Sequence, residues 1–229
     1  MPISTGRSRP SGNHAAEKLF DGVREFREKV FPEQREHFEK LAEGQSPGTL
    51  FITCADSRVV PEMLTQTEPG ELFVCRNIGN IVPTYGEMLG GVSAVIEYAV
   101  MALKVKNIVI CGHSDCGAMK GLLHVHDSAL DAMPTVRSWL RNAEAARTVV
   151  EATRGDLEGD DKVQALVEQN VITQLQHLET HPSVAAALAT DRIALHGWVY
   201  GIKGGDVRAY DVETKRFVPL HDLTPAEVA

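Results

Sequence analysis

Apolar and polar residues follow two different patterns along this chain: short apolar runs and helical spacing. Short, mostly apolar runs, typical of buried strands, occur at Thr49–Cys54, Glu71–Arg76, Asn107–Cys111, Arg192–Tyr200 and Val207–Tyr210. Apolar residues recur at helical spacing in the intervening stretches Gly90–Lys104, Met133–Glu151 and Asp161–Thr180. Because strands alternate with helices, the pattern predicts an α/β fold with a mostly parallel central sheet and helices on both faces.

The start of the chain has a different character. Residues 1–13 are polar and predict a loosely held tail, and residues 14–43 predict two charged helices separated by a break at Pro32. Such an arm buries little by itself, so we expect it to lie against the main body or another subunit. We see no internal repeat and no low-complexity linker. The expected organisation is a tail and helical arm over 1–48 and an α/β core over 49–229, forming one domain overall.

The composition and the net charge of the chain exclude some classes of function. The 229 residues are 43% hydrophobic, which suits one substantial core, and the net charge of −8 with no basic block argues against a nucleic-acid partner. The first residues lack the apolar centre of a secretory signal, and no apolar run reaches the roughly 18 residues of a membrane span. We therefore expect a cytoplasmic protein without a membrane partner. In that compartment, four cysteines favour metal binding or catalysis over disulfides.

Two motifs lie at the carboxyl ends of two of the predicted strands. Cys54-Ala-Asp56-Ser-Arg58 follows the first apolar run, and Cys111-Gly-His113-Ser-Asp-Cys116-Gly117 follows the third. If the strand order is 2-1-3, these two strands are neighbours, and open α/β sheets bind ligands where the order switches direction between them. Cys54, His113 and Cys116 would then meet. Two thiolates, an imidazole and an open fourth position are typical of a catalytic zinc site.

Other interpretations of these residues stay open at this point. Cys54 and His113 are also compatible with ordinary buried core positions, since unpaired cysteine is among the most buried residue types. A closed structural zinc with Asp56 as a permanent fourth ligand is a second possibility, and a Cys111–Cys116 redox pair is a weaker third. Strand alternation predicts that Cys111 packs in the sheet, and Cys75 reads as a core residue.

With these motifs, the sequence resembles the β-class carbonic anhydrases, and closely the bacterial form found with cyanate-degrading enzymes. The matching segments cover nearly the whole chain: residues 44–47, 54–58, 68–73, 76–77, 96–98, 111–117 and 196–200. The resemblance implies reversible hydration of carbon dioxide to bicarbonate and a proton, with one zinc ion per subunit. It also implies a sheet of order 2-1-3-4 plus an added strand, in a homodimer or a dimer of dimers.

The resemblance assigns roles to individual residues. Zinc held by Cys54, His113 and Cys116 would carry a hydroxide that attacks carbon dioxide. Asp56 would accept a hydrogen bond from the zinc-bound water, or bind the zinc itself in a closed state, and Arg58 would hold Asp56 in place. For the substrate pocket, the resemblance implies an apolar wall and two polar contacts: Phe73, Ile78 and Tyr98, with Gln45 and the Gly117 amide.

Some relatives of this class bind bicarbonate at a second, regulatory site. Arg76 and Tyr200 match two of its residues, but Phe51 stands where the third is a tryptophan, so we expect an open zinc site without this regulation.

Two rival functions share the same motifs: hydrolysis of carbon disulfide or carbonyl sulfide, and a non-catalytic scaffold stabilised by zinc.

Overall fold

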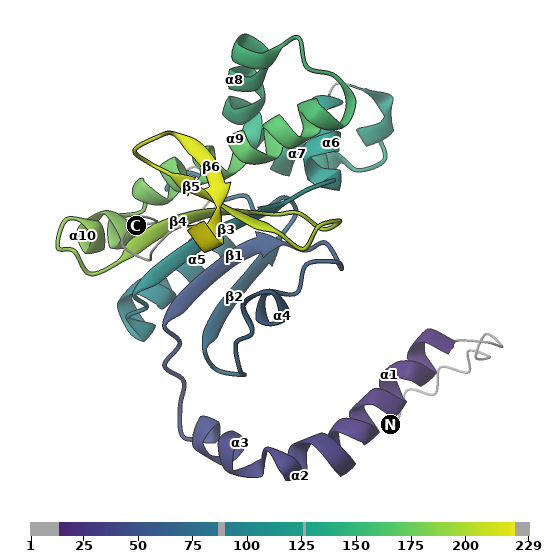
Figure 1. Cartoon of the computed structure of the whole chain (residues 1–229), viewed down its shortest axis with the longest axis vertical. Helices are drawn as coiled ribbons and strands as arrows, with labels where there is room; N and C mark the ends of the chain where they lie inside the picture. Colours follow the sequence, from purple (N-terminus) through teal and green to yellow (C-terminus); the bar gives the residue numbers. More distant parts are fainter. Residues whose placement is uncertain (1–13, 87–89, 126, 223–229) are drawn as a thin grey trace, which may run out of the picture. The chain divides into compact units, whose positions relative to one another are not determined.

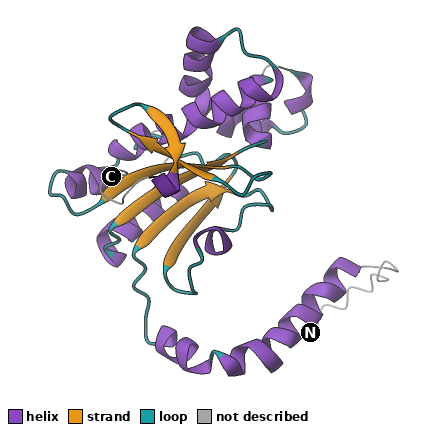
Figure 2. Cartoon of the chain, viewed as in Figure 1, coloured by secondary structure: helices purple, strands orange, loops and turns teal. Residues whose placement is uncertain are grey.

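The computed structural model describes residues 14–86, 90–125 and 127–222. By its internal contacts the chain divides into two units, Met1–Gln45 and Ser46–Ala229, which we describe separately. Figure 1 shows the chain coloured along its sequence, and Figure 2 shows its helices and strands in different colours.

The first unit is helical, as expected, but it does not break where the sequence predicts. Its elements are α1 (His14–Glu25), the π-helical turn η1 (Phe26–Val30), α2 (Phe31–Glu33) and α3 (Arg35–Ala42). The predicted break at Pro32 is wrong, because Pro32 lies in the first turn of α2, where its missing N–H removes no helical hydrogen bond. The backbone leaves the helical region at Gln34 instead. The predicted tail at 1–13 lies outside the described residues.

The second unit is built on one six-stranded sheet of order β2-β1-β3-β4-β5-β6. The strands are β1 (Thr49–Cys54), β2 (Leu72–Asn77), β3 (Asn107–His113), β4 (Ala194–Tyr200), β5 (Val207–Asp211) and β6 (Arg216–Pro219). The first four pair in parallel, and β5 and β6 are added antiparallel beyond β4. The predicted order is confirmed, with two added strands rather than one. The short edge strand β6 has only Phe217 and Val218 as apolar residues, too few for a recognisable alternation.

Helices connect the strands. They are α4 (Pro61–Thr65), α5 (Gly91–Glu97) continuing as the π-helical η2 (Tyr98–Leu103), α6 (Gly117–Leu123), α7 (Pro134–Leu140), α8 (Glu144–Arg154), α9 (Gly159–Glu179) and α10 (Pro182–Leu188). Three 3₁₀ turns complete the described elements: η3 (Ser128–Leu130), η4 (Arg141–Ala143) and η5 (Leu220–Asp222). The single helix predicted over Met133–Glu151 is wrong, because η4 interrupts it between α7 and α8. None of the described helices is long and apolar enough to cross a bilayer.

The two faces of the sheet are covered unequally. Alternate residues of β1 and β3, such as Leu50 and Ile108, join the large core formed with the helices, whereas Phe51, Val109 and Cys111 face the other way. On that second face, Trp198 of β4 packs beside these residues, and Leu64 of α4 packs against them.

The long helix α9 packs directly on β3 near its end and on the middle of β4. A Cβ atom added at Gly112 would lie 2.9 Å from Val171 Cγ2, and one added at Gly197 would lie 2.9 Å from Val171 Cγ1. Glycine at both positions therefore lets the helix approach the two strands closely. Gly112 immediately precedes His113, the last residue of β3.

Candidate metal centre

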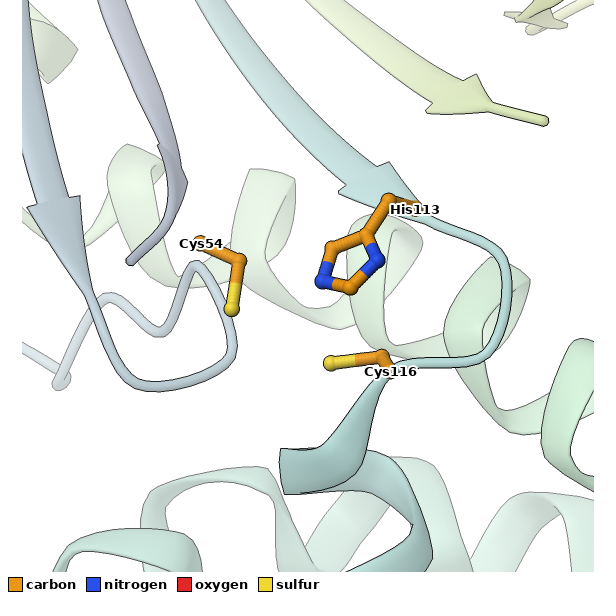
Figure 3. Close-up of side chains that lie close together, drawn as sticks. All are labelled: Cys54, His113 and Cys116. Carbon is orange, nitrogen blue, oxygen red and sulfur yellow. The ribbon is translucent and has the colours of Figure 1, made fainter. Parts of the chain in front are cut away.

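Three potential metal ligands come together at the carboxyl ends of β1 and β3. Cys54 is the last residue of β1, His113 is the last residue of β3, and Cys116 immediately precedes α6. Their ligand atoms all lie within 4.8 Å of one another, and all three residues are buried. Figure 3 shows the two sulfurs and the imidazole converging on one small space. The strand order predicted from the sequence thus brings the three side chains together.

The imidazole of His113 is oriented for binding a cation. Its Nδ1 lies 2.9 Å from the Ser114 carbonyl oxygen, so Nδ1–H donates and Nε2 keeps its lone pair. Nε2 is buried and has no hydrogen-bond partner among the described residues. An unpartnered buried acceptor is costly unless something else binds it, and a backbone bond at the other ring nitrogen is the usual arrangement of a metal-binding histidine.

The two sulfurs influence each other strongly. The pKa of Cys54 is lowered, chiefly because the Cys116 thiol acts as a hydrogen-bond donor to its sulfur. Burial opposes this effect, and the His113 imidazole and the Gly79 and Asp56 amides support it. The pKa of Cys116 is raised, because its proton is held in that bond and because the side chain is buried. Two buried thiols this close together can give up their protons to a single cation, which binds both as thiolates.

Beside the sulfurs, Asp56 and Arg58 form a two-pronged ion pair. Arg58 Nε donates to Asp56 Oδ1 at 2.9 Å and its terminal nitrogen to Oδ2 at 2.8 Å. The guanidinium holds the pKa of Asp56 well below its usual range. Asp56 Oδ2 lies 3.8 Å from His113 Nε2, so an ionised carboxylate lies next to the nitrogen that faces the two sulfurs.

Asp115 is a member of the site that the sequence reasoning missed. It lies between His113 and Cys116 with a φ of 58°, and its carboxylate accepts hydrogen bonds from Arg58, at 2.8 Å, and from Lys120. These two cations lower the pKa of Asp115 to about 2. Arg58 thereby joins the loop after β1 to the loop after β3. The acidic residue inside the second motif was the only signal available in the sequence.

Arg76 also has a role that the sequence did not indicate. Its guanidinium donates to the carbonyl oxygens of Cys54 at 3.2 Å, Asp56 at 2.7 Å and Val59 at 2.6 Å. It therefore shapes the loop that carries the first motif. Of the other two residues matched to a regulatory site, Tyr200 ends β4 opposite His113, and Phe51 packs edge-on against Trp198.

The expected substrate pocket is only partly assembled within the described unit. The rings of Phe73 and Tyr98 are in contact, with centroids 5.9 Å apart, and Tyr98 is half exposed. Ile78 is partly exposed, and its carbonyl oxygen accepts a hydrogen bond from Trp139. Gly117 is the first residue of α6 and has open space around it. Gln45 belongs to the N-terminal unit and is exposed there.

The remaining two cysteines behave as the sequence predicts. Cys75 packs in the large core and Cys111 in the smaller one. Burial raises the pKa of the Cys111 thiol to about 12, so this thiol stays protonated. All four cysteines are free thiols.

Comparison with known proteins places this arrangement in a family. The carbonic anhydrase family model matches residues 49–207. A carbonic anhydrase of Pseudomonas aeruginosa is 52% identical over 202 residues, covering 88% of this chain and 90% of its own. Carbonic anhydrase 1 of Escherichia coli O157:H7 is 54% identical over 203 residues, covering 89% and 91%.

Solved structures agree with the sequence matches. The β-carbonic anhydrase CcaA is 45% identical and superposes with a TM-score of 0.88 over 90% of this chain and 92% of its own. A Coccomyxa β-carbonic anhydrase in complex with acetazolamide is 33% identical, with a TM-score of 0.74 over 84% of each chain. These similarities extend over the sheet, its helices and both motifs, so the chain belongs to the β-class carbonic anhydrase family.

Proposed function

We propose that this enzyme catalyses the zinc-dependent, reversible hydration of carbon dioxide to bicarbonate and a proton. The observation that carries the proposal is the convergence of the ligand atoms of Cys54, His113 and Cys116 within 4.8 Å, in a chain of this family. Within the part of the chain that the structure describes, His113 Nε2 has no hydrogen-bond partner. When bound, one zinc ion per subunit supplies a Lewis acid that lowers the pKa of water toward neutrality, so that hydroxide attacks carbon dioxide.

The donor set supports zinc as the cation. Thiolate and imidazole are the ligands that zinc prefers, and three protein ligands leave a fourth tetrahedral position for water or substrate. The hydrogen bond from Nδ1–H of His113 to the Ser114 carbonyl fixes the ring so that Nε2 faces the two sulfurs.

Asp56 is proposed to act on the water beside the three ligands. Its carboxylate is ionised and next to His113, so it accepts a hydrogen bond from that water and orients the attacking lone pair. Arg58 holds both carboxylate oxygens and so keeps Asp56 from turning into the fourth ligand position. We therefore propose an open site, with Asp56 as a ligand only in a closed state.

The substrate pocket is proposed from the family resemblance. Phe73, Ile78 and Tyr98 would provide an apolar wall suited to carbon dioxide, and Gln45 with the Gly117 amide would provide polar contacts. The contact between the Phe73 and Tyr98 rings supports a shared wall. A neighbouring copy of the chain would supply the residues that one subunit leaves apart.

We further propose that the enzyme works as a homodimer or dimer of dimers in the cytoplasm. In support, two Sordaria macrospora β-carbonic anhydrases, one of them 31% identical to this chain, are described as tetrameric. The free thiols suit a reducing compartment. The finer resemblance, to the bacterial form that accompanies cyanate-degrading enzymes, is tested by the genes that neighbour this one.

Stopped-flow measurement of carbon dioxide hydration tests the proposal. The zinc-loaded protein should hydrate carbon dioxide with activity that rises at mildly alkaline pH, because two thiolates offset the charge of zinc and weaken its effect on water. Removal of zinc and the Cys116→Ser variant should each abolish activity. Cys75→Ser, which changes a cysteine outside the cluster, should keep it.

Two outcomes would contradict the proposal. If the protein binds one zinc ion per subunit but does not hydrate carbon dioxide, it is a scaffold that zinc stabilises and not an enzyme of this kind. Turnover of carbonyl sulfide or carbon disulfide without hydration of carbon dioxide would identify a hydrolase instead.

A further inference from the structure

The loop that follows β2 lies against the metal centre. The Gly79 N–H faces the Cys54 sulfur and helps to lower the pKa of that thiol. Gly79 has a φ of +81°, and a Cβ atom there would lie 2.9 Å from the Cβ of Ala118 in α6. The loop thus passes between Cys54 and α6 with no room for a side chain. The position of the Gly79 amide therefore depends on what holds this loop.

Helix α9 holds the loop through a stripe of polar side chains at helical spacing. Asn170 Nδ2 donates to the Gly79 carbonyl oxygen at 3.0 Å. One turn later, Gln174 Oε1 accepts from the Val82 amide at 2.8 Å, and Gln174 Nε2 donates to Asn170 Oδ1 at 2.8 Å. In the next turn, His177 Nδ1 donates to the Val82 carbonyl oxygen at 2.7 Å. The two amides form a continuous relay from Val82 to Gly79.

These amides lie deep in the protein. Asn170 is 1% exposed and Gln174 is not exposed at all, and Val167 and Val171 are buried on the same helix. Burying an amide is unfavourable unless its groups are hydrogen-bonded, and apolar side chains of the same size would fill this space at lower cost. What apolar side chains cannot do is hold two particular backbone groups in place.

We propose that Asn170 and Gln174 are positioning residues of the metal centre: they fix the Gly79 amide against the Cys54 sulfur and thereby set how tightly that sulfur binds the cation. The inference rests on the metal site of the proposed function. Loss of a group that hydrogen-bonds to a metal ligand and orients it typically lowers metal affinity about 10–100-fold. The Gly79 N–H also withdraws electron density from the sulfur, which gives the relay a spectroscopic signature.

Cobalt(II) binding to the full-length chain tests this inference. The variants Asn170→Leu and Gln174→Met remove the relay with little change in volume. We expect each to bind cobalt about 10–100-fold more weakly in competition with a chelator. We also expect the thiolate-to-cobalt charge-transfer band to move to longer wavelength, because the Cys54 lone pair loses the stabilising N–H.

Two control variants separate positioning from stability. Leu178→Ala empties a fully buried position on α9 that makes none of these hydrogen bonds, and Gln176→Met changes an exposed amide on the same helix. Leu178→Ala should lower the melting temperature while leaving cobalt affinity and the band unchanged. Gln176→Met should change neither. If Asn170→Leu does not fold, Gln174→Asn replaces it, because its shorter side chain keeps an amide but does not span the relay.

Relay variants with wild-type cobalt affinity and an unmoved band would overturn the inference, whatever their melting temperatures. That result differs from a failure of the proposed function. If the wild-type chain itself gave no thiolate-to-cobalt band, the metal site and the inference would both fall.

Discussion

Arg58 is the side chain that joins the two halves of the metal centre. It holds Asp56 from the loop after β1 and Asp115 from the loop after β3. Because Arg58 and Asp115 are substantially exposed, their ion pair contributes little to the free energy of unfolding. Its value lies in the geometry that it imposes on the two loops.

Replacing Asp56 by Asn should sharply reduce carbon dioxide hydration while zinc still binds. The variant keeps the shape of the side chain but loses the charge that orients water, so we expect a loss on the order of 10²-fold in kcat/KM. Stopped-flow kinetics with zinc analysis on the same sample would measure both quantities. Asp131→Asn is the matched control, because Asp131 also pairs with an arginine, Arg137. Equal activity in the two variants would show that Asp56 is an ordinary ion-pair partner.

At the residue scale, the sequence indicates the candidate metal ligands better than the residues that hold the surrounding loops in place. Cys54 and His113 are recognisable because each follows a run of apolar strand residues, and topology then brings strand ends together. The supports depend on contacts between distant segments. Asn170 and the Gly79 carbonyl that it binds are 91 residues apart, and nothing in the sequence of a long charged helix marks that amide as buried.

Among the elements, α9 has the widest influence on the site. It packs on β3 and β4 at Gly112 and Gly197, and it holds the loop after β2 through its polar stripe. Immediately beyond it, His181 precedes α10 and lies 3.1 Å from the Pro83 carbonyl oxygen. One helix and its exit thus fix the backbone from Gly79 to Pro83.

The stability of this contact should depend on pH. Burial lowers the pKa of His181, with His177 nearby acting in the same direction. A lowered folded-state pKa means that the unfolded chain binds the proton more readily, so stability is full above the unfolded pKa of about 6.5 and is lost as pH falls below it. The His181→Gln variant should therefore gain melting temperature relative to the wild type on acidification. Melting curves that stay a constant distance apart from pH about 8 to pH about 5 would contradict this account.

Long elements with a clear period are predicted well, and short or interrupted ones are not. The strand at Thr49–Cys54 is predicted to the residue, since a continuous apolar run ends at a motif. The helix α10 and the strand β6 are missed, because seven and four residues are too short to establish a period. The break at η4 is missed because Arg141–Ala143 carries no glycine or proline.

At the scale of the whole molecule, the N-terminal unit leaves large apolar side chains exposed. On the N-terminal unit, Leu19, Phe20 and Val23 are each about two-thirds exposed or more. Exposed apolar side chains that gather on one helix indicate a contact with another surface. The sequence predicted an arm of this kind but not what it packs against, because that depends on a second surface that a sequence pattern does not locate.

We expect the purified chain to be at least a dimer. Light scattering after size exclusion should give a mass of at least twice the 25.0 kDa of one chain, because association removes these apolar side chains from water. The triple variant Leu19→Ser, Phe20→Ser, Val23→Ser should lower that mass. A wild-type mass of 25.0 kDa would show that the arm does not serve assembly.

The proposed activity depends on one cation bound by two sulfurs and one imidazole nitrogen. X-ray absorption at the zinc edge on the zinc-loaded wild-type enzyme at mildly alkaline pH tests it most directly. We predict two sulfur neighbours at about 2.3 Å, with one nitrogen and one further light atom at about 2.0–2.2 Å. A coordination sphere with fewer than two sulfurs would contradict the assignment of Cys54 and Cys116, and with it the proposed function.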